Sequence, residues 1–197
     1  MVVTAIEMTK VKITLVGLPP GLLFQGKGVM EADKADPTSS KKKVYRPADE
    51  EAALRAHWKG NGKKHELCIP SVMLYNSFCQ AAVDFKNPNN KKQSMASLIG
   101  STICFDEVLI GMGHSEYEVY EEYVKIPPRT GAMVKIGRPL IRDWKVTFCM
   151  GCDCEMWDVG LLQEIIRTAG KVVGIGAWRP KLRGPYGKFQ LLEFKTV

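Results

Sequence analysis

The sequence predicts a single α+β domain in which two helices cover one face of an antiparallel sheet. Three observations lead to this prediction. The chain has 197 residues, enough for one well-filled core. Its hydrophobic fraction of 45% and charged fraction of 25% are those of an ordinary globular protein. Two strongly helical patterns also occur, and each has strand patterns on both sides.

The first quarter of the chain predicts a strand, a loop and a short helix. Residues 11–17 alternate in polarity and are rich in β-branched side chains, so we expect a strand that ends at the following GLPPG. Residues 25–47 contain the polar stretch KADPTSSKKK and predict a mobile surface loop. Residues 49–58 begin with acids, which favour the N-terminus of a helix.

The strongest helical pattern spans residues 71–86, with Ser71 as the expected N-cap. Its apolar positions recur at helical spacing: Val72, Tyr75, Cys79, Ala82 and Val83. The polar NPNNKK ends it, a short helix is expected at about 93–99, and the apolar residues 101–110 predict a strand.

The middle of the chain predicts an inserted β-hairpin over residues 112–139. Its arms are residues 117–126 and 132–136, and its turn, PPRTG, carries Arg129. Residues 140–150 predict the next strand, because Trp144, Val146 and Phe148 alternate with polar residues.

The last elements are a helix over residues 158–169 and a strand over 187–195. Asp158 is the expected N-cap of this helix and Gly170 its expected stop. The order is then β-α-β-β-α-β, which is the ferredoxin-like, RRM-like arrangement. The aromatic signature of RRM domains is absent, so that family is not predicted.

Charge and composition indicate the kind of partner. The net charge of +7 favours nucleic acid, and the acids gather between residues 116 and 122, which suits head-to-tail association of copies. No apolar run reaches the roughly 20 residues of a membrane span, and no signal peptide is recognised, so we expect a cytoplasmic protein without a membrane partner. Its six cysteines are then expected to be reduced.

The segment from residue 171 to 189, KVVGIGAWRPKLRGPYGKF, predicts contact with a polyanion. It has no acid, and its glycines allow backbone amides to approach a phosphate. Trp178 and Tyr186 are expected to stack on bases. The predicted contact residues are Lys171, Gly174, Gly176, Trp178, Arg179, Lys181, Arg183, Gly184, Tyr186, Gly187 and Lys188, with Arg129 as a clamp. A solvated, glycine-rich crossover is the alternative interpretation.

Two segments resemble the RAMP superfamily, the ferredoxin-like backbone and processing proteins of CRISPR effector complexes. VVGIGAWRPKLRGPYGKF is similar to the glycine-rich loop that joins the family's last helix and strand. IPSVMLYNSFCQAA is similar to the opening of its first helix, with Gln80 where an arginine commonly meets the guide RNA. The resemblance implies a ferredoxin-like fold that handles single-stranded nucleic acid. A phage or mobile-element protein that coats single-stranded DNA or RNA fits it equally well.

The leading hypothesis is therefore a non-enzymatic, cofactor-free protein that binds single-stranded RNA or DNA and assembles side by side along the strand. A second hypothesis is a metal-independent endoribonuclease using His57 or His65, beside the lysines at 59, 63 and 64. A third is an assembly protein whose basic loop meets an acidic protein. Cys149, Cys152 and Cys154 have the spacing of zinc ligands, although core or turn cysteines explain them better.

Overall fold

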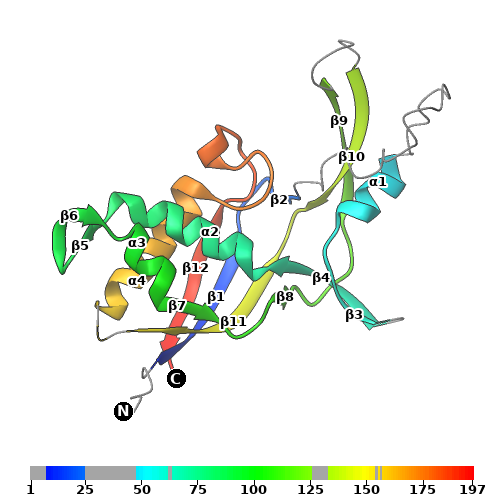
Figure 1. Ribbon diagram of the computed structural model, residues 1–197. Coiled ribbons are helices and arrows are strands. Elements are labelled where there is room, and N and C mark those ends of the chain that lie inside the picture. The colour runs from blue at the N-terminus through cyan, green and yellow to red at the C-terminus, as the bar shows by residue number, and fades with distance from the viewer. Residues whose placement is uncertain (1–7, 25–47, 62–63, 126–132, 154, 156) are drawn as a thin grey trace, which may run out of the picture.

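A four-stranded antiparallel sheet with helices on one face forms the centre of the molecule (Figure 1). The computed structural model describes residues 8–24, 48–61, 64–125, 133–153, 155 and 157–197. The predicted loop at 25–47 and the turn with Arg129 lie outside these residues. Among them the chain is of the mixed α+β class, with several antiparallel sheets.

The central sheet has the strand order β12-β1-β11-β7, and every neighbouring pair is antiparallel. Its strands are β1 (Thr9–Gly17), β7 (Ile103–Phe105), β11 (Lys145–Cys152) and β12 (Phe189–Thr196). Helices α2 (Ser71–Ala81), α3 (Ala96–Thr102) and α4 (Val159–Thr168) lie on one face of it, as Figure 1 shows. The elements β1, α2, β7, β11, α4 and β12 follow one another along the chain in the predicted alternation.

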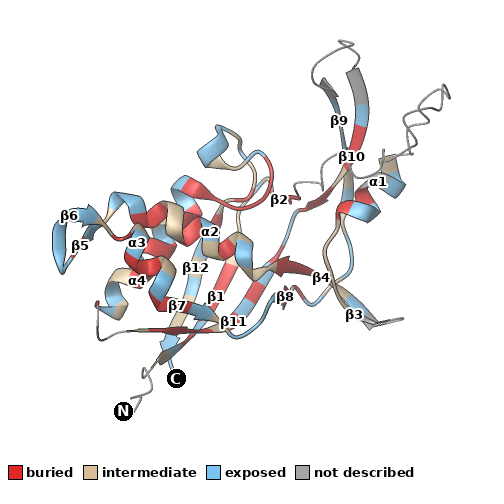
Figure 2. Ribbon diagram, in the orientation of Figure 1, coloured by how far each residue is buried: buried red, intermediate tan, exposed pale blue. Residues whose placement is uncertain are grey.

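The core lies between this sheet and its helices (Figure 2). In β11 the predicted alternation is confirmed: Val146 and Phe148 are buried, as is Trp144 just before the strand, whereas Lys145 and Thr147 are exposed. Strand β1 and helices α2 and α4 also contribute buried side chains to this core, among them Ile13 of β1, Phe78 of α2 and Ile166 of α4. The second face of the sheet is polar.

Several smaller elements surround the central layers. The arm consists of β9 (Glu118–Lys125) and β10 (Met133–Ile141), which pair in an antiparallel manner and extend away from the sheet in Figure 1. β2 (Leu22–Leu23) pairs with the end of β10. The remaining elements are α1 (Ala48–Arg55), β3 (Trp58–Asn61), β4 (Lys64–Pro70), a 3-10 turn (Ala82–Asp84), β5 (Lys86–Asn87), β6 (Asn90–Ser94) and β8 (Leu109–Gly111). Strands β3, β4 and β8 form a sheet of their own.

Helix α2 begins and ends differently from the prediction. Pro70, in an extended conformation, occupies the N-cap position, and Ser71 is the first helical residue. The helix ends at Ala81, five residues before the predicted end at residue 86. A 3-10 turn follows, and Phe85 after it is extended. The predicted N-cap of α4 is confirmed, because the Asp158 carboxylate accepts a hydrogen bond from the Gly160 amide at 3.1 Å.

The predicted strand over residues 101–110 is confirmed only in part, over β7 and the first two residues of β8. Residues 101 and 102 end helix α3, where the Thr102 hydroxyl donates to the Leu98 carbonyl and accepts from the Trp157 indole, both at 2.9 Å. The rest of this apolar run forms two short strands in different sheets. β7 pairs with β11 in the central sheet, and β8 pairs with β4 in the smaller one. One apolar run therefore serves two different sheets.

Two other boundaries also differ from the prediction. Gly170 does not stop α4, because the chain continues through a π-helical turn, Ala169–Val173, and leaves the helix at Gly174. A Cβ on Gly170 would lie 2.1 Å from the Phe189 carbonyl oxygen, so this glycine permits close packing on β12. The predicted strand over residues 140–150 is divided, since residues 140 and 141 end β10 and the chain bends before β11.

Candidate functional site

The glycine-rich segment forms one loop, residues 174–188, which folds back onto β2 and the turn before it. Its backbone amides are largely used inside the protein. The Ala177 amide donates to the Leu23 carbonyl at 2.7 Å, and the Gly187 amide donates to the Gly21 carbonyl at 2.8 Å. Within the loop, further donors are the amides of Ile175, Leu182, Arg183, Gly184 and Tyr186. These groups are not available to a phosphate.

The glycines of this loop serve its own packing. A Cβ on Gly184 would lie 1.9 Å from the Trp178 carbonyl oxygen, and one on Gly187 would lie 1.8 Å from the Ile175 carbonyl oxygen. A Cβ on Gly176 would likewise lie 2.4 Å from the Leu23 carbonyl oxygen. The expectation that these glycines open the backbone to phosphate is therefore replaced by a structural role, since protein atoms already fill the space.

Three of the predicted basic contact residues are exposed: Lys171, in the π-helical turn before the loop, and Lys181 and Arg183 of the loop itself. None of the three forms an ion pair within the described part of the chain. Arg179 and Lys188 are half-buried, and the Arg179 guanidinium donates to the Gly176 carbonyl at 3.3 Å.

The two predicted stacking residues differ. Trp178 is 50% exposed, and no other aromatic ring among the described residues packs against it. Tyr186 instead packs edge-on against Tyr120 of β9, with ring centroids 5.7 Å apart, and burial raises the pKa of its hydroxyl. Tyr186 therefore joins the loop to the arm, and Trp178 is the aromatic ring presented to solvent.

A groove of about 480 Å³ separates the loop from the first turns of α2. Its polar lining consists of His57, Asn76, Ser77, Gln80 and Arg179. The buried Ser77 hydroxyl donates to the Gly174 carbonyl at 3.0 Å and so fixes the loop against the helix. Asn76 and Gln80 stand four residues apart on one helix face, and this spacing is the signal that sequence reasoning left unused.

A second hollow, of about 420 Å³, lies beside Ala177 and Trp178. Its lining combines the loop residues Ala177, Trp178, Leu182, Arg183 and Gly184 with Arg138 of β10. The Arg138 guanidinium pairs with the Glu122 carboxylate at 2.6 Å, and both side chains are largely buried. Nothing in the sequence near the loop indicates Arg138, because β10 is far from it along the chain.

The two candidate histidines lie in different places. His57 lines the groove beside Arg179, and its ring packs edge-on against Phe24 with centroids 5.0 Å apart. His65 is exposed on β4, where it packs against Trp58. In the β3–β4 ladder the His57 carbonyl accepts from the Cys68 amide, whereas His65 is opposite Gly60, so about 10 Å of strand separates the two histidines.

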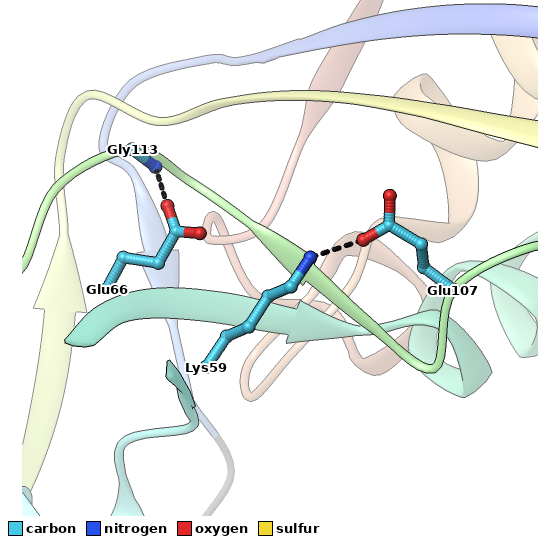
Figure 3. Close-up of polar contacts among 4 residues, drawn as sticks. All are labelled: Lys59, Glu66, Glu107 and Gly113. Atoms are coloured by element: carbon cyan, nitrogen blue, oxygen red, sulfur yellow. Dashed lines mark hydrogen bonds and ion pairs between the residues drawn. The ribbon is translucent and has the colours of Figure 1, made fainter. Parts of the chain in front are cut away.

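Of the lysines near these histidines, Lys59 is engaged with an acid of the protein. It forms an ion pair with Glu107, and this hydrogen bond raises the pKa of Lys59 (Figure 3). In the same view the Glu66 carboxylate accepts from the Gly113 amide at 2.6 Å. Residue 63 and the side chain of Lys64 lie outside what the structure describes. Lys59 and Glu66 are therefore both occupied by partners within the protein.

The cysteine cluster does not assemble as a zinc site in the described residues. Cys149 and Cys152 are three positions apart on β11, so they point to opposite faces of the sheet, and Cys152 is fully buried in the core. Cys154 lies outside the described residues. Among those described, no three His, Cys, Asp or Glu side chains are placed to hold a metal ion.

Comparisons with known proteins do not identify a family. No protein-family model matches this chain, and no curated protein matches it. In the part of the chain described here, no helix is both long enough and apolar enough to span a bilayer.

Proposed function

We propose that this protein binds single-stranded nucleic acid without cleaving it. The phosphates would lie along the glycine-rich loop and in the groove beside α2. The observation that carries this proposal is the loop itself, in which exposed cations stand on a well hydrogen-bonded backbone next to a half-exposed tryptophan. These cations have no acidic partner among the residues that the structure describes. Such a surface combines the charge and the stacking that single strands need.

We further propose that the central unit is ferredoxin-like. The antiparallel order β12-β1-β11-β7 with two crossover helices on one face supports this assignment. The loop between the last helix and the last strand supports the proposed kinship with the RAMP superfamily. A phage or mobile-element origin, a cytoplasmic location and side-by-side assembly of copies along the strand belong to the same proposal.

Fluorescence anisotropy tests the proposal. Labelled single-stranded DNA and RNA of matched sequence are titrated with protein in EDTA at about 50 and 200 mM salt, and the mixtures are then run on a denaturing gel. We expect binding that weakens at the higher salt, with intact oligonucleotide. The preferred nucleic acid follows from the same titrations. Absence of binding to both at about 50 mM salt would reject the proposal and favour an acidic protein partner.

A paired charge reversal locates the surface. Replacing Lys181 and Arg183 with Glu should lower the slope of log affinity against log salt by about 1.4, at about 0.7 per lost phosphate contact on a single strand. The matched control reverses two exposed lysines on the polar face of the central sheet, Lys145 and Lys195, and should leave the slope largely unchanged. Equal effects of the two pairs would mean that binding is spread over the whole surface.

The second candidate function is a metal-independent endoribonuclease. One observation favours it, the placement of His57 in the groove beside Arg179. Cleavage of a hairpin RNA in EDTA, abolished by His57→Ala and retained by His65→Ala, would establish it. His65 is the appropriate control because its exposed ring lies on β4, away from that groove.

A further inference from the structure

We propose that the hollow beside Trp178 receives one unpaired nucleobase of the bound strand. This inference rests on the proposed function, since it names what the loop does with the strand besides contacting its phosphates. The hollow is distinct from the groove beside α2: Gly176 and Arg179 line the groove, whereas Ala177 and Trp178 line the hollow.

The walls of the hollow have the chemistry of a base pocket. Trp178 is 50% exposed and Leu182 is 56% exposed, so an aromatic face and a branched aliphatic side chain stand next to each other in water. A planar heterocycle between them would remove both apolar surfaces from water. The volume of about 420 Å³ is sufficient for one base with its sugar outside.

The backbone around the hollow is strained. Trp178 has φ of 50° and Arg183 has φ of 61°, and they are the only described residues other than glycine with positive φ. The strain is maintained by the loop, because the Trp178 carbonyl accepts from the Tyr186 amide at 3.1 Å and Gly184 packs directly on the Trp178 backbone. Backbone strain of this kind clusters at ligand-binding sites, so its presence at an exposed aromatic ring supports the assignment of the pocket.

The hollow also carries charge. Its available cation is Arg183, which lines it and is exposed, whereas the charge of Arg138 from β10 is balanced by its ion pair with Glu122. A guanidinium group stacks on bases, donates to base edges and attracts the phosphates that flank an inserted base. An apolar wall with an exposed cation beside it favours a nucleobase over the aromatic side chain of a protein partner, which carries no phosphate.

Abasic oligonucleotides test this inference. Affinity is measured for a 12-nucleotide dT strand and for an all-abasic strand with the same number of phosphates, in EDTA at about 50 mM salt. We expect the protein to bind dT about tenfold or more tightly than the abasic strand, the gain from stacking of one base. Trp178→Ala should bind both strands alike, with the affinity of the abasic strand unchanged.

Two further variants keep the test specific. Tyr123→Ala removes an exposed aromatic ring of the arm, 65% exposed, and should retain the preference for dT. Leu182→Ser removes the aliphatic wall without changing charge and should reduce the preference. Far-UV circular dichroism of each variant checks that it is folded.

The outcomes separate the two proposals. Equal, salt-sensitive affinity of the unaltered protein for dT and abasic strands would overturn the base pocket and leave the proposed function standing. Failure to bind either of these strands and the matched RNA of the anisotropy titration would overturn the proposed function and the pocket with it. A preference for dT that survives in folded Trp178→Ala would also overturn the assignment of the pocket.

Discussion

The glycine-rich loop and the β3–β4 hairpin contain the same kinds of residue, yet the protein uses them differently. Both have basic side chains, an aromatic ring and glycine at positive φ: Gly60 in the hairpin, and Gly174, Gly176 and Gly187 in the loop. In the hairpin, Lys59 is paired with Glu107, and Glu66 binds the Gly113 amide on the facing segment. In the loop, the backbone amides are satisfied by carbonyls and the cations face water.

The position of the acids explains this difference. Glu66 and Glu107 lie on elements packed next to Lys59, whereas residues 171–189 contain no acid at all. A cation without an acidic neighbour keeps its charge available for a ligand. The candidate surface therefore differs from the hairpin in that its exposed cations have no acidic partner in the described part of the chain, and not in the number of its basic residues.

The largest difference should appear when a Cβ is added to a glycine of the loop and to Gly113, on the segment that faces the hairpin. Gly187→Ala places a Cβ 1.8 Å from the Ile175 carbonyl oxygen at φ of 70°, so we expect unfolding free energy to fall by about 3 kcal/mol or more. Gly113→Ala has a φ of 78° but no atom within 4 Å of the new Cβ, so only about 1 kcal/mol of backbone strain is expected. Urea denaturation measures both. Similar losses would contradict the account of loop packing.

A smaller effect is expected from the strained tryptophan. Trp178→Gly should be more stable than Trp178→Ala by about 1 kcal/mol, because glycine adopts the left-handed backbone at φ of 50° without penalty. The same urea experiment applies. Since both variants lack the ring, their difference reports the backbone alone, and a more stable alanine variant would show that the loop relaxes once the ring is removed.

Removing one charge from the loop and one from the hairpin should change nucleic-acid binding differently. Arg183→Met is expected to lower the salt slope of single-strand binding by about 0.7, the loss of one phosphate contact. Lys59→Met should leave the slope unchanged, because Lys59 is engaged with Glu107. Anisotropy at several salt concentrations measures both slopes. A lower slope for Lys59→Met would place the hairpin on the binding surface.

The smallest effect concerns pH. The hydrogen bond to Glu107 raises the pKa of Lys59 above its ordinary value of 10.5, so the ion pair stabilises the protein fully below pH 10.5 and is lost as pH rises through the folded pKa. Because both side chains are substantially exposed, only about 0.3 kcal/mol is expected. Urea titrations at pH 9 and pH 11 should show this loss in the unaltered protein and a smaller one in Lys59→Met.

Local patterns predicted the central layers well. The alternation around Phe148 and the capping residue Asp158 are both confirmed, because each depends on neighbours within a few positions. The apolar run that ends α3 was misassigned because its two halves join different sheets, and pairing of this kind is set by distant strands. The hairpin prediction gave both strands of the arm, although β10 extends to Ile141 through its pairing with β2.

The candidate site was predicted in its composition and not in its arrangement. Of the loop's basic residues, Lys181 and Arg183 are exposed, whereas Arg179 and Lys188 are half-buried. The role of Gly184, the use of Tyr186 in packing and the presence of Arg138 all depend on contacts between segments far apart in the chain. Periodicity and turn chemistry carry no information about such contacts.

A small apolar cluster has a consequence for the motions of the molecule. Leu23, Leu140 and Ala177 are buried together, with Tyr120 and Tyr186 packed around them, so the cluster joins β2, the arm and the loop. If the loop moved away from β2, the packing of this cluster would be lost, and the arm would lose its contacts with the loop in the same step. Amide hydrogen exchange in these three segments should therefore rise and fall together, as one cooperative unit separate from the central sheet.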